Sequence, residues 1–148
     1  MTIEAPSWSD PAVARRILLE FHVWAVVGAS PDPTRASHGV TRSLIRFGYE
    51  VIPIYPRATT IHGLATVPDL RSAAAQRPAD SPIEVVDIFR ASHRAGAHVD
   101  EAIEIGARAV WLQLGVWDGA AAERAAAAGL LVVMDRCPAI DYPSLIRG

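Results

Sequence analysis

Five short apolar runs recur along the chain, and segments with apolar residues at helical spacing separate them. The runs are continuous rather than alternating, which is typical of parallel strands that are covered on both faces. Strands that alternate with helices and connect through right-handed crossovers form a doubly wound sheet. The sequence therefore predicts a single α/β domain with a parallel five-stranded sheet and helices on both faces. The predicted strands span about 23–27, 49–54, 83–88, 109–112 and 130–134.

Capping and breaking residues predict where the helices begin and end. Ser9 or Asp10 is placed to cap the first helix, and Ser92 and Asp118 are placed to cap two later ones. We divide the domain, residues 1–148, into an N-terminal arm and helix, 1–22, and a core, 23–142. The predicted helices span about 11–21, 38–47, 67–77, 92–105 and 118–128, whereas 58–64 is predicted to be a loop and the residues after 134 a short tail.

The stretch from Trp24 to Gly39 joins the first strand to the next helix and holds the main candidate ligand site. Gly28 lets the backbone turn and lets a ligand come close, because it has no Cβ atom. Ser30 offers a hydroxyl group, and the helix that begins near His38 directs its free N–H groups toward the loop. In a parallel α/β sheet this junction lies at the carboxyl edge, where ligands bind. The loop is therefore predicted to bind phosphate.

The composition argues against several other classes of protein. The 148 residues are 51% apolar, and the net charge of −2 comes without a basic run, so nucleic acid is not an expected partner. No apolar run is long enough to span a membrane and the N-terminus lacks a signal-peptide pattern, so we expect a cytoplasmic protein. The single cysteine excludes an internal disulfide and a multi-cysteine metal site. The absence of lysine excludes a P-loop or Schiff-base lysine.

Arg57 indicates which kind of nucleotide the loop would hold. Dinucleotide loops carry three glycines and a carboxylate about 20 residues further on that binds a ribose hydroxyl. Here the next glycine after Gly28 is Gly39, inside the predicted helix, and Arg57 follows the second strand where the carboxylate would stand. A guanidinium suits a phosphate on the ribose, so coenzyme A (3′-phosphate) and NADP (2′-phosphate) both fit better than NAD. The other interpretation of Arg57 is a solvated loop residue.

Five blocks of sequence resemble the small stand-alone coenzyme A-binding proteins. These are single Rossmann-like domains, similar to the first domain of the succinyl-CoA synthetase alpha subunit. The blocks occur in order and at compatible spacing, and they are Val27–Ser30, Gly48–Pro56, Val86–Arg90, Trp111–Val116 and Val133–Pro138. The resemblance is more specific for family and fold than for activity, because the family is defined by its domain.

The resemblance implies a cofactor-binding role for residues at four sites along the chain. It implies that Gly28, Ala29 and Ser30 take the pyrophosphate, that Arg35 and Ser37 make secondary phosphate contacts, that Pro53, Tyr55 and Pro56 wall the adenine, that Arg57 meets the ribose phosphate, that Phe89 and Arg90 flank the nucleotide, and that Gly115 and Val116 border the pantetheine arm. Many relatives have lysine in place of Arg57, and arginine keeps that charge.

We predict no catalytic residue and no metal site. His38, at the helix start, either donates to a phosphate or caps and packs. Cys137 has no adjacent histidine, so we favour a buried structural thiol over a mixed disulfide with coenzyme A. Asp87 is expected to be structural. Asp135 and Arg136 are expected to form a local pair or surface charges.

The function favoured by these observations is non-covalent binding of coenzyme A or an acyl-CoA by a monomer or small homo-oligomer. Two alternatives stay open: an NADP-binding oxidoreductase, and a detached subunit of an acyl-CoA ligase that acts with a protein partner. The resembling synthetases pass phosphate through a histidine in a second domain, together with a partner subunit. We therefore expect the functional resemblance to stop at binding.

Overall fold

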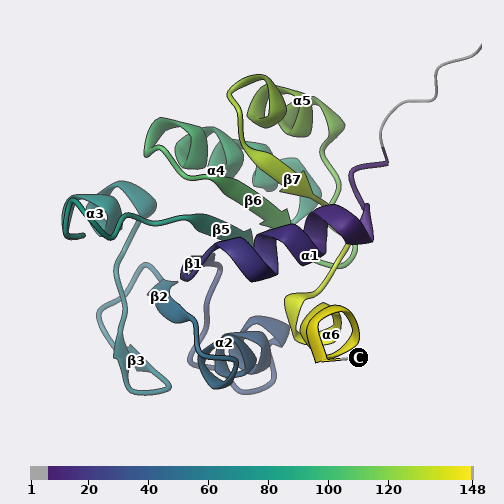
Figure 1. Cartoon of the computed structure of the whole chain (residues 1–148). Helices are drawn as coiled ribbons and strands as arrows, with labels where there is room; N and C mark the ends of the chain where they lie inside the picture. Colours follow the sequence, from purple (N-terminus) through teal and green to yellow (C-terminus); the bar gives the residue numbers. More distant parts are fainter. Residues whose placement is uncertain (1–6, 148) are drawn as a thin grey trace, which may run out of the picture.

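The fold is a parallel five-stranded sheet between two layers of helices (Figure 1). A computed structural model describes residues 7–147; residues 1–6 of the predicted N-terminal arm and residue 148 lie outside the described residues. The strand order is β2-β1-β5-β6-β7, and every neighbouring pair is parallel. The strands are β1 (Val23–Val27), β2 (Glu50–Ile54), β5 (Val85–Ile88), β6 (Ala109–Leu112) and β7 (Leu131–Val133). The predicted fold class and its five strands are confirmed.

The helices occur where the sequence predicts them, with one exception at the C-terminus. Asp10 and Asp118 act as N-caps, each accepting a hydrogen bond from a backbone N–H of the first turn. The segment after β7, predicted to be a tail, is helical instead. The helices are α1 (Pro11–Glu20), α2 (Ala36–Arg46), α3 (Leu70–Ala75), α4 (Ser92–Glu104), α5 (Gly119–Ala127) and α6 (Pro138–Asp141), which continues into the π-helical turn η1 (Tyr142–Arg147).

Two further details differ from the sequence predictions. Ser92 is the first residue of α4 rather than its cap; its hydroxyl accepts a hydrogen bond from the N–H of Trp117 at 3.0 Å instead. The predicted loop at 58–64 contains most of a small antiparallel hairpin, β3 (Thr60–Ile61) and β4 (Leu64–Ala65). Gly63 allows the tight turn, with φ +80°.

Two hydrophobic clusters, one on each face of the sheet, form the core. Helices α1, α2 and α6 cover one face, and α3, α4 and α5 cover the other (Figure 1). Side chains of β1 alternate between them: Ala25 points into the second cluster, whereas Trp24 and Val26 point into the first. Trp24 and Trp111 are fully buried, with ring centroids 5.7 Å apart.

The strand order reverses between β1 and β5, and this point fixes where a ligand can enter. The chain leaves β1 toward β2 on one side, and the later strands add on the other. The loops after β1 and β5 therefore diverge and leave space between them at the carboxyl edge. The N–H of Phe89, just past β5, donates to the carbonyl of Val27 at 2.8 Å, so the two strand ends lie side by side.

None of the helices in the described part of the chain is long and apolar enough to cross a membrane. Among residues 7–147, no group of three or more histidine, cysteine, aspartate or glutamate side chains is placed to hold a metal ion.

Candidate functional site

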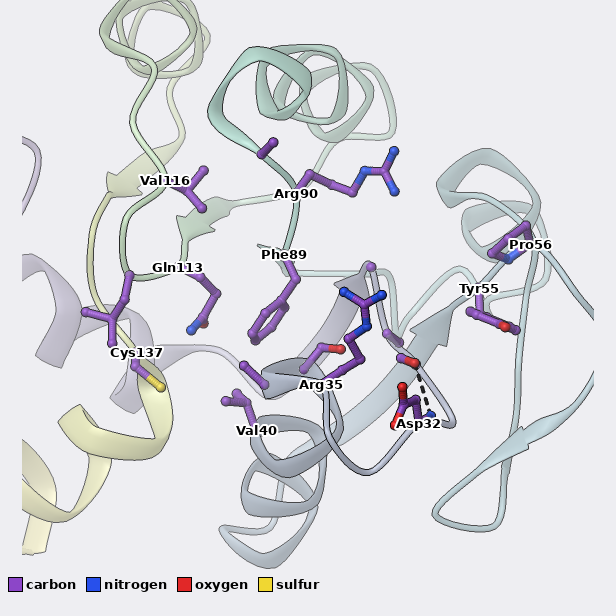
Figure 2. Close-up of a pocket in the computed structure, with 17 residues that line it drawn as sticks. Asp32, Arg35, Val40, Tyr55, Pro56, Phe89, Arg90, Gln113, Val116 and Cys137 are labelled. Carbon is purple, nitrogen blue, oxygen red and sulfur yellow. Dashed lines mark hydrogen bonds between the residues drawn. The ribbon is translucent and has the colours of Figure 1, made fainter.

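A cavity of about 750 Å³ lies at the carboxyl edge of β1 and β5, at the point where the strand order reverses. Its walls come from the β1–α2 loop, the end of β2, the β5–α4 junction, the loop after β6 and the start of α6. Figure 2 shows these side chains converging from separate elements. Most of the predicted cofactor-binding residues line it: Gly28, Ala29, Ser30, Arg35, Ser37, Tyr55, Pro56, Phe89, Arg90 and Val116.

The β1–α2 loop turns sharply at Gly28 and presents polar groups beside the cavity. Gly28 has φ +83°, and a Cβ atom there would lie 2.2 Å from the carbonyl oxygen of Phe89. The hydroxyl of Ser30 accepts a hydrogen bond from the N–H of Asp32 at 3.1 Å, which leaves its own hydrogen free to donate to a ligand. Within the described chain no side chain caps α2, so its first N–H groups are available to an anion.

Asp32 is the one acidic side chain in the cavity wall, and it is already engaged. Its Oδ1 accepts hydrogen bonds from the backbone N–H and the hydroxyl of Thr34, at 2.9 and 2.8 Å. These two bonds hold the pKa of Asp32 below its usual value, the backbone bond having the larger effect. The carboxylate of Asp32 therefore stabilises the conformation of the loop, and part of its negative charge is offset by the two hydrogen bonds from Thr34.

Two arginines supply positive charge to the cavity. Arg35 precedes α2 and Arg90 follows β5, so both extend from the ends of elements beside the β1–α2 loop. The Nε–H of Arg90 is buried and has no hydrogen-bond partner among residues 7–147. A buried donor without an acceptor is costly, by about 1–3 kcal/mol and more when the group is charged. The charges of both guanidinium groups would attract an anionic ligand in the cavity.

The two ends of the cavity differ in chemistry. Figure 2 shows Tyr55 and Pro56 at one end and Gln113, Val116 and Cys137 at the other. The first end offers an aromatic ring and a proline ring, which are flat surfaces suited to a base. The second end is mostly apolar, because apolar side chains surround the amide of Gln113. A cavity whose chemistry changes in this way from one end to the other suits an elongated ligand with a base, a charged centre and a less polar arm.

A buried polar pair, Asp87 and Gln113, lies beside the second end. Asp87, within β5, is fully buried, and this desolvation raises the pKa of its carboxyl well above the usual value. Gln113, just past β6, is only 6% exposed. In the amide orientation that satisfies its surroundings, Nε2 of Gln113 donates to Asp87, 2.9 Å from Oδ1 and 3.3 Å from Oδ2. The sequence predicts a structural Asp87 but gives no signal for Gln113.

The raised pKa of Asp87 predicts a pH-dependent effect of Asp87→Asn. The folded state keeps the proton on Asp87 to a higher pH than the unfolded state, in which the pKa of this carboxyl is about 3.8. The stability that this proton contributes is therefore present below pH 3.8 and is lost as pH rises through the folded pKa. Asp87→Asn cannot lose this proton. Its free energy of unfolding should therefore increase relative to wild type as pH rises from 4 upward. Urea unfolding at a series of pH values measures this; parallel curves for the two proteins would contradict it.

Three of the predicted residues do not line the cavity. Pro53 lines a second cavity of about 270 Å³, between β2, the hairpin and α3. Arg57 is exposed, one residue beyond Pro56, and its carbonyl accepts a hydrogen bond from the hydroxyl of Thr66 at 2.7 Å. Gly115 lies in the loop after β6, where its N–H donates to Asp135 at 2.7 Å. The cavity walls that were not predicted from the sequence are Asp32, Ala36, Val40, Ala91, Gln113, Leu114 and Cys137.

His38 and Cys137 have different surroundings. The ring of His38 packs against that of His62 at an interplanar angle of 45°, with centroids 4.1 Å apart, and Nε2 of His62 donates to the carbonyl of His38 at 2.7 Å. His38 is outside the cavity wall, so the packing interpretation is the better one. Cys137 is buried, as expected, yet it also borders the cavity.

Comparison with known proteins identifies a family and several proteins of similar sequence or structure. Residues 22–143 match the family described as CoA binding domain. An uncharacterized protein of Bacillus subtilis (strain 168), YneT, is 34% identical over 113 residues, which cover 76% of this chain and 79% of that protein. A hypothetical protein from Pyrococcus horikoshii OT3 has a structure with TM-score 0.82, 31% identity and 99% coverage of both chains. A dinucleotide-forming acetyl-coenzyme A synthetase from Ca. Korarchaeum cryptofilum shares the fold at TM-score 0.65 and 23% identity, over 78% of this chain and 26% of its own.

Proposed function

Because the chain belongs to the CoA binding domain family, we propose that it binds coenzyme A non-covalently in the cavity between β1 and β5. The observation that carries this proposal is the β1–α2 loop in the cavity wall, with Gly28 at φ +83° and with Arg35 and Arg90 among the other lining residues. The pyrophosphate of coenzyme A supplies the negative charge that these two guanidinium groups attract. Its base, charged centre and pantetheine arm also match the three parts of the cavity in order.

The ligand lies along the carboxyl edge of the sheet in this proposal. The pyrophosphate accepts hydrogen bonds from the loop at Gly28 and Ser30 and from the start of α2, with Arg35 and Arg90 neutralising its charge. The adenine packs on Tyr55 and Pro56. The pantetheine arm extends past Phe89 toward Val116 and Cys137. No catalytic step is included, because no side chain of the described cavity pairs a nucleophile with a base.

Calorimetry with coenzyme A, dephospho-coenzyme A and NADP, each titrated into the same protein, tests this proposal. We expect coenzyme A to bind and the affinity to fall when the 3′-phosphate is removed. Binding of NADP without coenzyme A would support the oxidoreductase alternative, for which the comparisons give no support. Failure of all three ligands to bind would overturn the proposal and direct attention to a partner chain.

Arg57→Ala should weaken coenzyme A binding about tenfold or more, by roughly 1.5–3 kcal/mol, because its guanidinium is assigned to the 3′-phosphate. The exposed position of Arg57, just past the adenine end of the cavity, leaves its side chain free to reach the ribose. The same substitution should leave dephospho-coenzyme A binding unchanged. Arg108→Ala, at an exposed position at the opposite edge of the sheet, is the matched control. Equal losses for both ligands would show that Arg57 does not contact the 3′-phosphate.

A further inference from the structure

Gln113 is a buried amide in an otherwise apolar part of the cavity wall. It follows β6 directly, is 6% exposed, and lies near Val40, Val116 and Cys137 among the lining residues. Figure 2 shows its side chain directed into the space between Cys137 and Phe89. A polar group at such a place has a cost unless it is hydrogen-bonded, and in ligand cavities a few polar groups of this kind fix which ligand fits.

In its ionised form Asp87 offers only acceptors, and so it determines which atom of that amide lies toward β5. The Nε2 of Gln113 donates to both carboxyl oxygens of Asp87, at 2.9 and 3.3 Å, and the opposite side of the amide faces donors rather than acceptors. Asp87 cannot turn away, because it is fully buried within β5 between two parallel neighbours. Gln113 is thereby held with its oxygen Oε1 on the side away from Asp87. An amide oxygen has two lone pairs and accepts up to two hydrogen bonds.

We propose that Gln113 is a specificity-determining residue that accepts a hydrogen bond from an amide N–H of the ligand's arm, and that Asp87 is the residue that positions it. This inference rests on the proposed function, since the pantetheine arm of coenzyme A carries two amide N–H groups and passes this end of the cavity. A ligand whose arm lacks a donor leaves Oε1 without its second partner and binds more weakly. The pair thus selects for the arm, whereas the phosphate loop selects for the nucleotide.

The composition of the chain makes this contact directly observable by NMR. The sequence has no asparagine and only two glutamines, Gln76 and Gln113, so a ¹⁵N spectrum contains two side-chain amide groups. Gln76 is exposed at the end of α3 and serves as an internal control. We expect coenzyme A to shift the Gln113 amide protons strongly and adenosine 3′,5′-bisphosphate, which lacks the arm, to shift them little. Neither ligand should shift Gln76.

Affinities of variants test the energetic part of the inference. Gln113→Met keeps the length of the side chain and removes the acceptor, so coenzyme A should bind about tenfold more weakly while adenosine 3′,5′-bisphosphate binds as to wild type. Gln76→Met is the matched control and should change neither affinity. Above the folded pKa of Asp87, where the carboxylate only accepts, Asp87→Asn instead offers Gln113 both a donor and an acceptor, so the amide loses its single orientation. It should weaken coenzyme A severalfold, and it should have no further effect in the Gln113→Met background.

Each result separates the inference from the proposed function. If wild type binds coenzyme A but Gln113→Met binds it equally well, Gln113 is not a specificity residue and the inference is overturned. If Gln113→Met loses both ligands equally, the side chain only supports the cavity, which also overturns it. Unperturbed Gln113 signals in wild type saturated with coenzyme A would overturn it without any variant. If wild type binds neither ligand, the proposed function fails, and the inference fails with it.

Discussion

Gly28→Ala is expected to abolish coenzyme A binding and to lower the free energy of unfolding by about 2–5 kcal/mol. This range combines about 1–2 kcal/mol for a left-handed backbone at a non-glycine residue with about 1–3 kcal/mol for forcing an atom into filled space. The added Cβ would lie 2.2 Å from the carbonyl oxygen of Phe89, a backbone atom. That backbone is fixed, because the N–H of Phe89 bonds to Val27. The loop must therefore move, and the loop carries the proposed phosphate contacts.

Gly39→Ala provides the matched control within the same segment. No described atom lies within 4 Å of a Cβ built at Gly39, which is inside α2 and has an ordinary helical φ. Replacing a helical glycine with alanine gains up to about 1 kcal/mol of helix propensity, so this variant should be at least as stable as wild type and should still bind. Urea unfolding and calorimetry measure both variants. Wild-type binding by a stably folded Gly28→Ala protein would remove the loop from the proposed site.

Local sequence was enough to predict the strands, because each is a continuous apolar run whose ends are marked. The predicted span of β1 agrees with the structure at both ends, and Asp10 and Asp118 cap the helices that they were predicted to cap. Family and fold followed from five short blocks around the strand ends. Patterns of this kind involve only a few neighbouring residues, so they can be recognised without knowledge of the tertiary structure.

What sequence could not predict depends on contacts between distant residues. Ser92 was predicted to be an N-cap, yet its hydroxyl accepts a hydrogen bond from the N–H of Trp117, which lies in the loop after β6. The C-terminal segment was predicted to be a tail because its few residues show no long apolar repeat. It becomes helical because Tyr142 stacks on Phe47, with ring centroids 4.1 Å apart, and packs against Tyr49.

The residues of the candidate site divide in the same way, into those that local sequence predicts and those that depend on contacts between distant residues. Gly28 and Ser30 in the β1–α2 loop were predicted because glycine and serine at a strand end have a local meaning. Gln113 was missed because one polar residue after a strand gives no local signal. Only the pairing of β5 with β6 brings it next to Asp87. Pro53 lies within β2, before the strand ends, and lines the second cavity, which block resemblance alone does not reveal.

Arg136→Met is expected to cost about 3–5 kcal/mol of stability, the usual effect of removing one partner from a buried ion pair. The expected local pair of Asp135 and Arg136 does not form. Instead, the guanidinium of Arg136 binds both carboxylate oxygens of Asp141, at 2.7 and 2.9 Å, and donates to the carbonyl of Ser9 at 3.0 Å. Both side chains are largely buried, 19% and 9% exposed. The substitution would leave the carboxylate of Asp141 without its partner.

The control is Arg124→Met, which breaks a geometrically similar pair with Asp100 in which both side chains are about half exposed. Such a pair contributes at most about 1 kcal/mol. The double variant Arg136→Met with Asp141→Leu should recover much of the loss, because it removes the unpaired carboxylate. Urea unfolding compares the four proteins; equal costs for the two single variants would show that burial of the Arg136 pair does not matter. Because Cys137 borders the cavity and follows Arg136 directly, we also expect the single variant to bind coenzyme A more weakly, and the double variant to regain binding together with stability.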